Sequence, residues 1–455
     1  MPAIDNNNNK EAHISRKLGV ITATSIVVAN MVGAGIFTTS GIMAANLPSS
    51  TWVLLCWLLG GFIAVSGALC YAELATRMPE EGGEYIYLKQ LYHPVIGFLT
   101  GWTSFLVGFS APIAASALGS VAYISAGLSS GLDYIDASQL NLYQKIAAIG
   151  IIFVFTIIHY LGLKVGALVQ NLLTAIKIII VFGLASLGIA FGSGDWSHFS
   201  YEISSDFGGM AFGTAMMLVM FSYSGWNASA YIAGELKEPR KTLPISLVLG
   251  TAIVMIIYLA INIFIFYAAP YDQLKGVITV VELAAVNSFG EWMSNTLGLL
   301  IGIALLSSLS AFILIGPRVY FAMALDRLFF PFAAKVHPKF EVPGRSIIIQ
   351  GTIAILMVII GSFEQLLIYI GFALGIFPWL AIAGLFIARK QHIGDESAVK
   401  VWGYPYVPIF FLTCSLVLMI IAYSNRPLES SAAIVTVLLG VPFYFIWIVG
   451  IAKNR

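Results

Sequence analysis

Charged residues and cysteine are both scarce in this sequence. Only 10% of its 455 residues are Asp, Glu, Lys or Arg, while 59% are apolar. Soluble domains carry about 25% charged residues, so the composition excludes a soluble globular protein and predicts one that resides in a membrane. The net charge of +1 gives no sign of a nucleic-acid partner, and we expect none.

The chain has three cysteines, and each lies inside an apolar run. Cys56, Cys70 and Cys414 are therefore placed where neither an extracellular disulfide framework nor a metal site is expected. We predict no metal and no other cofactor. The first apolar run is too long for the core of a signal peptide, so we also predict no cleaved targeting segment.

Several protein classes are excluded by features that the apolar runs lack. A channel needs a continuous polar pore, and the runs contain no ring of charges and no carbonyl-filter repeat. An enzyme needs a nucleophile, a metal set or an acid–base pair within the spans, and the sequence offers none there. A receptor needs an added soluble domain or long loops, and the sequence shows neither. The remaining class is a transporter, so we expect no enzymatic activity.

Apolar runs predict twelve membrane-spanning helices, because about 20 apolar residues cross a bilayer. Runs 18–47 and 208–236 are interrupted near the middle, and a short amphipathic stretch at 279–289 is expected on the outer surface. The predicted fold class is an all-α membrane protein. The ten uninterrupted spans are predicted at 51–76, 94–127, 144–163, 166–191, 244–269, 291–324, 345–362, 365–389, 404–424 and 430–452.

Lysine and arginine fall mainly on one side of the predicted spans. With the N-terminus inside, 19 of the 23 lie in cytoplasmic segments, Lys145, Lys275 and Arg426 lie outside, and Lys177 lies within a span. Basic residues concentrate on the cytoplasmic side of membrane proteins. We therefore predict a multi-pass protein in the lipid bilayer of the plasma (inner) membrane, with both termini in the cytoplasm.

The two interruptions divide the chain into matching halves. Gly33-Ala34-Gly35 breaks the first span, and 221–229 breaks the sixth. Paired breaks in corresponding places indicate the binding site of a secondary transporter. Because each half has five spans, the second half must insert with inverted orientation. The predicted organisation is a cytoplasmic tail (1–17), a first repeat (18–191), an inverted second repeat (208–389) and two additional helices (404–452).

Each break supplies backbone groups that suit an α-amino acid. The half-helix that begins near Gly35 presents free N–H groups and a partial positive charge, and both favour a carboxylate. The carbonyls at Met31 and around 221–224 favour an ammonium. Alternatively, Gly33 and Gly35 only allow two helices to pack closely. The second break favours the binding interpretation, and hence alternating access to an amino acid site.

Five sequence motifs extend from about Leu18 to the C-terminus. They are V-G-A-G-I-F (32–37), Y-A-E-L-A-T-R-M-P-E-E-G-G-E-Y-I-Y (71–87), F-S-Y-S-G-W-N (221–227), E-L-K-E-P-R-K-T-L-P (235–244) and the segment around Arg318. Together they resemble the amino acid–polyamine–organocation (APC) superfamily, and most closely its L-type amino acid transporter group. The resemblance implies the APC fold, with broken helices 1 and 6.

The resemblance also implies a substrate site at the two breaks. It implies contacts to the substrate carboxylate at residues 33–35 and to the ammonium at nearby carbonyls. Phe221 is expected to close over the substrate, and Asn227 to hydrogen-bond near it. Trp226 either lines the pocket or only fills the span. The implied substrate-binding residues are Met31, Gly33, Ala34, Gly35, Phe221, Ser224, Trp226 and Asn227.

The predicted substrate is a neutral L-amino acid, moved by exchange or by coupling to protons. An arginine or polyamine exchanger is the alternative. No carboxylate lies at mid-membrane to pair with a cationic side chain, but the face of Trp226 is an alternative partner for a cation. Ser224 stands where many L-type members have glycine. The loop 128–142 lacks the cysteine that animal members use to join a glycoprotein, so no disulfide-linked partner subunit is expected.

Lys177 lies about ten residues from either end of its predicted span. Charged residues at such depth are functional by default. We consider two roles: bracing the carbonyls of the first break, or carrying a proton in each transport cycle. Near the cytoplasmic ends, Glu84, Glu235 and Arg318 are predicted to form a gate, with Glu73 nearby. The alternative is that these side chains are solvated at the ends of the spans and contribute little to stability.

The predicted orientation can be tested with single cysteines in a cysteine-free background. An impermeant thiol reagent applied from outside should label Ser130→Cys and Ser204→Cys, while Ser397→Cys should be protected. The distribution of basic residues is the physical reason. Labelling in the reverse pattern would refute the orientation.

Overall fold

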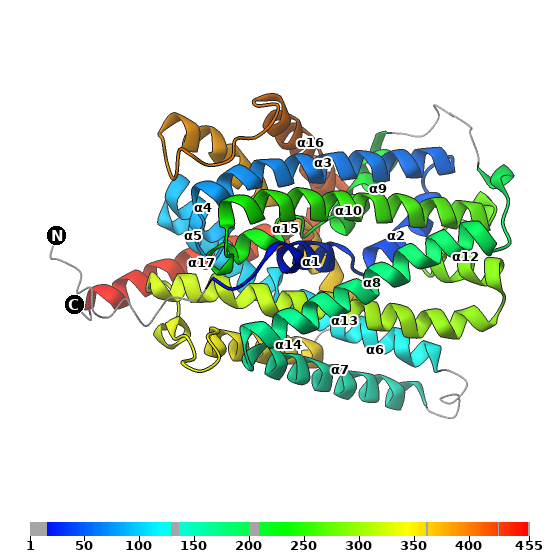
Figure 1. Cartoon of the computed structure of the whole chain (residues 1–455), viewed down its shortest axis with the longest axis horizontal. Helices are drawn as coiled ribbons and strands as arrows, with labels where there is room; N and C mark the ends of the chain where they lie inside the picture. Colours follow the sequence, from blue (N-terminus) through cyan, green and yellow to red (C-terminus); the bar gives the residue numbers. More distant parts are fainter. Residues whose placement is uncertain (1–15, 129–135, 200–208, 361–362, 426, 454–455) are drawn as a thin grey trace.

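The protein is an all-α bundle, as the sequence predicts, and it is described here from a computed structural model (Figure 1). The structure describes residues 16–128, 136–199, 209–360, 363–425 and 427–453. Within these ranges the only β-pairing consists of two isolated bridges, Leu18 with Leu236 and Glu81 with Ile232.

The centre of the bundle is formed by helices that are apolar on nearly every side. They are α1 (Val20–Met31) with α2 (Gly35–Ala44), α5 (Pro94–Thr103) with α6 (Ser110–Gly127), and α13 (Trp292–Leu325). In the apolar windows of these three spans, 67%, 83% and 72% of residues are buried within the protein. A helix without a polar face is stable only inside a protein or a membrane.

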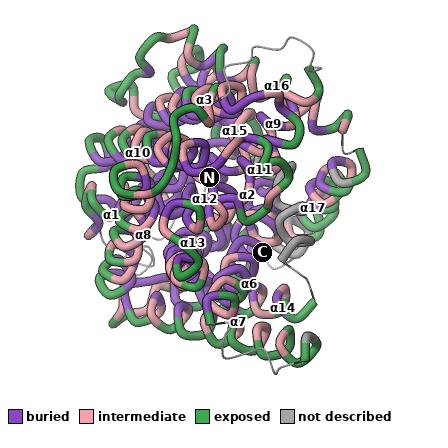
Figure 2. The backbone as a smooth tube through the Cα atoms, turned by 90° about the vertical axis from the view of Figure 1, so that its right-hand side faces the viewer, coloured by how far each residue is buried: buried purple, intermediate pink, exposed green. Residues whose placement is uncertain are grey.

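The outer helices turn apolar side chains away from the protein. Buried residues make up 22% of the apolar window in α7 (Ala137–Tyr160), 28% in α8 (Leu163–Phe191), 17% in α16 (Tyr406–Asn425) and 22% in α17 (Pro427–Lys453). Figure 2 shows this gradient, with buried backbone inside and exposed backbone on α7 and α17. Exposed apolar helices of this length fit the hydrocarbon of a bilayer.

The remaining helices follow the predicted spans closely. Nine helical spans in the described residues are long and apolar enough to cross a membrane, and the total of twelve spans stays a prediction. The amphipathic stretch is present as α12 (Val280–Phe289), while α4 (Glu84–Leu91) and α11 (Tyr271–Leu274) were not predicted. The other helices are α3 (Ser50–Arg77), α9 (Gly209–Ser222), α10 (Pro239–Ala268), α14 (Gly344–Ile360) and α15 (Phe363–Lys390).

Two predicted spans differ in their internal structure. The third span contains a π-helical segment at Ser104–Gly108, between α5 and α6. The sixth span is α-helical only as α9; after its break the chain forms short 3₁₀ turns at Ala228–Tyr231 and Ala233–Glu235. This second segment contains Asn, Ser and Gly residues, which favour turns over an α-helix.

The described chain begins and ends at the same end of the bundle, toward the left of Figure 1. An even number of crossings produces this arrangement. Ser130 and Ser204, two of the positions chosen for labelling, lie outside the described residues. Ser397, the third, is exposed in the loop between α15 and α16. The side of the membrane on which the termini lie, and the inverted five-helix repeats, stay predictions.

Candidate functional site

The first break separates α1 from α2 at residues 32–34. The Val32 backbone leaves the helical region, with φ −77° and ψ 85°, and α2 begins at Gly35. The amide of Gly33 donates to the carbonyl of Met31 at 2.9 Å. The start of α2 therefore has no preceding turn of helix to accept its first N–H groups, although the amide of Phe37 donates to the carbonyl of Ala34 at 3.1 Å.

The second break follows α9 and lies against the first. Gly225 adopts a positive φ of 99°, and a side-chain carbon placed on it would lie 2.9 Å from Cβ of Asn30 in α1. Only glycine allows this approach. The buried hydroxyl of Tyr258, in α10, lies 2.6 Å from the carbonyl oxygen of Met31 and 2.8 Å from that of Ser222. It can donate to either, so it joins the two breaks.

The space beside the breaks is open at Gly33. A carbon built on Gly33 would have no heavy atom within 4 Å, whereas one on Gly35 would collide with the side chain of Ser222. Gly33, Ala34 and Ser224 are each partly exposed, although they lie in the middle of the bundle. Open space beside helix N–H groups is the arrangement that the carboxylate interpretation requires.

The carbonyls near the breaks differ in their availability. The Met31 carbonyl, where we expected an ammonium, already has the amide of Gly33 and the hydroxyl of Tyr258 as donors. The Phe221 carbonyl accepts from the amide of Ser224 at 3.1 Å. Among the described residues, the Ser224 carbonyl has no hydrogen-bond donor. In this conformation Ser224 therefore offers the most available acceptor of the three.

Lys177 reaches from α8 to the first break and is 1% exposed. Its ammonium donates to the carbonyls of Ala29 at 3.1 Å and Val32 at 2.6 Å, and to the hydroxyl of Ser308 at 2.8 Å. A protonated lysine has three N–H donors, and this site provides three acceptors. Ser308, in α13, lies 2.9 Å from the Ala29 carbonyl and 3.1 Å from the Val32 carbonyl.

The remaining predicted substrate residues lie on or just after α9. Phe221 is partly exposed and packs against the core, while Trp226 is 5% exposed and contacts Tyr71 edge to face. Asn227 is 9% exposed, and its amide donates to Glu84 at 2.5 Å. Of the predicted substrate residues, Gly33, Ala34, Phe221 and Ser224 are partly exposed at the two breaks. The others, Met31, Gly35, Trp226 and Asn227, are buried, and the contact of all eight with a substrate stays a prediction.

Below the second break, Glu235 and Arg318 form a buried ion pair. Nε of Arg318 donates to Oε1 of Glu235 at 2.7 Å, and Nη2 donates to Oε2 at 3.1 Å. Both side chains are at most 1% exposed. The Glu235 carbonyl also accepts from the amides of Lys17 and Leu18, at 2.9 and 3.0 Å. The entry to α1 and the chain below the second break are thus held together.

Glu84 was grouped with this gate, but its partners are different. It lies at the start of α4 and is 4% exposed. Its carboxyl accepts from the hydroxyl of Tyr71 at 2.7 Å and from the amide of Asn227 at 2.5 Å. Within the described residues, no lysine, arginine or histidine pairs with Glu84.

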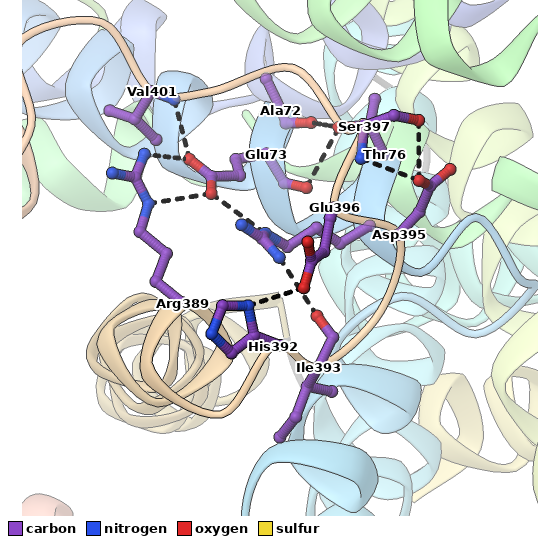
Figure 3. Close-up of polar contacts among 11 residues, drawn as sticks. Ala72, Glu73, Thr76, Arg389, His392, Ile393, Asp395, Glu396, Ser397 and Val401 are labelled. Carbon is purple, nitrogen blue, oxygen red and sulfur yellow. Dashed lines mark hydrogen bonds and ion pairs between the residues drawn. The ribbon is translucent and has the colours of Figure 1, made fainter.

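Glu73, in contrast, is surrounded by donors (Figure 3). Its carboxylate accepts from Arg77 at 3.0 Å, from Arg389 at 2.9 and 2.5 Å, and from the amide of Val401 at 2.8 Å. Arg77 also donates to the carbonyl of Ile393. This cluster fastens the end of α3 to the end of α15 and to the loop that follows it.

Sequence reasoning missed Tyr258 and Ser308. Each is a hydroxyl residue in an apolar span, and nothing in the local sequence separates them from the other 19 tyrosines or from the serines at helix contacts. The usable signal was the broken span itself. A break leaves carbonyls without donors, so neighbouring spans must supply hydroxyl or ammonium groups.

The fold and the two adjoining breaks define a multi-pass membrane transporter. Comparison with known proteins identifies the kind. The sequence pattern of the family described as "Amino acid permease" matches residues 18–451. The chain belongs to this family, within the APC superfamily and close to the L-type group, and it is an amino acid transporter.

Three relatives illustrate the similarity. The serine/threonine exchanger SteT of Bacillus subtilis (strain 168) is 31% identical over 95% of this chain and 97% of its own length. The b(0,+)-type amino acid transporter 1 of Mus musculus is 28% identical over 96% of this chain and 89% of its own length. The large neutral amino acids transporter small subunit 2 of Homo sapiens is 26% identical over 95% and 80%.

The two glycines of the first break should respond differently to an added methyl group. Gly33→Ala should leave thermal stability near that of the parent and weaken amino acid binding, because its methyl group enters the open space. Gly35→Ala should lower stability by about 1–3 kcal/mol, because its methyl group forces α2 away from α9. Thermal unfolding with and without amino acid measures both effects. Equal stability losses in the two variants would contradict this assignment.

Lys177→Met should remove three hydrogen bonds from the first break. We expect a lower unfolding temperature and loss of most transport, because hydrogen bonds from a charged donor contribute about 1.5–3 kcal/mol each. Lys164→Met is the matched control, since Lys164 is exposed on the same helix. Unfolding temperature and initial transport rate are the measurements. If Lys177→Met has the unfolding temperature and transport rate of the parent, the ammonium does not stabilise the first break.

Proposed function

We propose that this protein exchanges neutral L-amino acids across the plasma membrane by alternating access, with both termini in the cytoplasm. The observation that carries the proposal is the open space at Gly33, which precedes the start of α2 at Gly35. The second break, which contains the available carbonyl of Ser224, packs against α1 through Gly225 and Asn30. A donor set and an acceptor so placed match the two ends of an α-amino acid.

The relatives support this choice of substrate and mode. One is named a serine/threonine exchanger, and another a transporter of large neutral amino acids. The buried carboxyl groups described nearby have partners within the protein: Glu235 has Arg318, and Glu84 has Tyr71 and Asn227. A cationic substrate would need a carboxylate that faces the open space. The arginine or polyamine alternative is therefore not favoured.

The conformation is closed on the side that carries the basic residues. The Glu235–Arg318 pair is buried, and the Leu18–Leu236 bridge lies beside it. At the breaks themselves, Gly33, Ala34 and Phe221 keep partial exposure. Opening toward the cytoplasm then requires the buried ion pair to separate. Such a pair is costly to break when one partner stays buried, so both must reach water together.

Lys177 is assigned the bracing role. Its three acceptors match the three N–H donors of the charged form. A fixed charge at the first break replaces the need for a metal cation there. We therefore propose that transport does not require sodium, and that no disulfide-linked subunit is involved, because the loop 128–142 lacks cysteine.

The test is counterflow in proteoliposomes. Vesicles preloaded with unlabelled serine, threonine or leucine should take up labelled serine faster than empty vesicles, with no stimulation by sodium. Vesicles preloaded with arginine or putrescine provide the contrasting arm. Stimulation by these cations alone would favour the alternative substrate class. Uptake that no internal amino acid stimulates would refute exchange.

Phe221→Ala should slow exchange more than it weakens binding. Phe221 lies at the end of α9, just before the second break, and we propose that its aromatic ring covers a bound amino acid. Its removal should prevent occlusion while leaving the backbone contacts intact. Comparing the dissociation constant with the initial counterflow rate separates the two effects. Phe212→Ala, in the same helix, is the control, and exchange by Phe221→Ala at the parent rate would remove Phe221 from the mechanism.

A further inference from the structure

Glu84 stands apart from the other two buried carboxyl groups near the cytoplasmic side. Glu73 and Glu235 are each 0% exposed, and each has an arginine partner. Glu84 is 4% exposed and has no cationic partner among the described residues. Transfer of an unpaired carboxylate from water to the protein interior is strongly unfavourable, and the usual outcome is that the group takes up a proton.

Among the described residues, the groups that hydrogen-bond to the carboxyl of Glu84 are all neutral. Tyr71 of α3 donates its hydroxyl, and Asn227 of the second break donates its amide. Tyr231, from the 3₁₀ turn after the break, also interacts with the carboxyl through its hydroxyl, and Tyr87 of α4 lies close by. Arg318, the nearest basic group of the gate, is engaged by Glu235.

The position of Glu84 connects its charge to the gate. It belongs to the segment between the spans α3 and α5, outside both, yet its carboxyl is bonded to the unwound chain below the second break. That chain runs from Asn227 directly to Glu235. When the cytoplasmic side opens, this chain must move, and the carboxyl loses its cover.

We propose that Glu84 is a proton-binding site that is protonated while the cytoplasmic side is closed and releases its proton to cytoplasmic water on opening. The step is the dissociation of the carboxylic acid into a carboxylate and a hydrated proton, with no other bond changed. The acid form keeps the contacts to Tyr71 and Asn227, and the carboxylate becomes stable once water reaches it.

The acid–base behaviour of the group agrees with this placement. Burial raises the pKa of Glu84 from its ordinary value of 4.5 to about 7. Between these two pH values, the closed form keeps a proton that the open form has lost. Raising the pH through this window therefore favours opening, by up to about tenfold per pH unit, and the dependence ends above pH 7 because both forms are then ionised.

The experiment measures opening directly, without any amino acid. A reporter cysteine replaces Ser229, which is 0% exposed in the turn after Asn227, in a full-length chain without the three native cysteines. The protein is held in lipid nanodiscs and treated with an impermeant maleimide between pH 5 and pH 8. The rate is divided by that of an exposed Ser397→Cys reporter, which removes the pH dependence of the reagent itself.

The parent should show labelling that rises with pH up to about 7 and is constant above it. Glu84→Gln should label slowly at every pH, because its side chain stays neutral. Glu80→Gln, which removes an exposed carboxylate from the same segment, should keep the parent profile. Tyr71→Phe removes a donor that favours the carboxylate, so its plateau should shift to higher pH.

A pH-independent parent, or a Glu84→Gln profile that still rises like the parent, would overturn the proposal. If Glu84→Gln does not fold, Tyr71→Phe decides, since an unshifted plateau also overturns it. The inference depends on the proposed function in one respect, because alternating access defines the open and closed forms. Exchange without pH-dependent labelling refutes the proton site alone, and pH-dependent labelling without exchange refutes the exchange function alone.

Discussion

Backbone groups released by a broken helix at membrane depth must find partners inside the protein, and this requirement organises the centre of the molecule. The carbonyls of Ala29 and Val32 are met by Lys177 and Ser308, and those of Met31 and Ser222 by Tyr258. Three different spans thus converge on the breaks. The same contacts leave the N–H groups of α2 and the Ser224 carbonyl available. Some of the unwound backbone groups thus stabilise the fold, and the others are available to the proposed substrate.

The side predicted to be cytoplasmic contains three buried carboxyl groups that are neutralised in different ways. Glu73 has four hydrogen-bond contacts from two arginines and an amide, Glu235 has one bidentate arginine, and Glu84 has only neutral donors. A buried charge is stable only when opposite charges and hydrogen bonds offset the cost of removing it from water. We therefore expect the Glu73 cluster to remain closed and the Glu235–Arg318 pair to separate on opening. Glu84 is expected to lose its proton on opening.

Much of the fold was predictable because its signals are long and simple. Twenty-residue apolar runs and their glycine interruptions place the helices and both breaks. The position of Lys177 near mid-span already required acceptors at a break, and Lys177 contacts the first one. The sequence could not show which hydroxyls complete the site, because Tyr258 and Ser308 are defined by contacts between distant spans. The π segment at 104–108 and the 3₁₀ turns after Asn227 also depend on tertiary contacts that override local preference.

The Glu73 cluster fastens one flank of the side that is predicted to be cytoplasmic. It holds α3 and α15 to the loop 391–405, and Arg240 of α10 is paired with Asp395 in the same loop. With these three helix ends fastened, we expect that flank to move least when the protein opens. The opposite flank, beside α13, is closed by the Glu235–Arg318 pair and the Leu18–Leu236 bridge. We therefore expect a departing amino acid to pass along α13, so that Arg318 lies on one wall of its route.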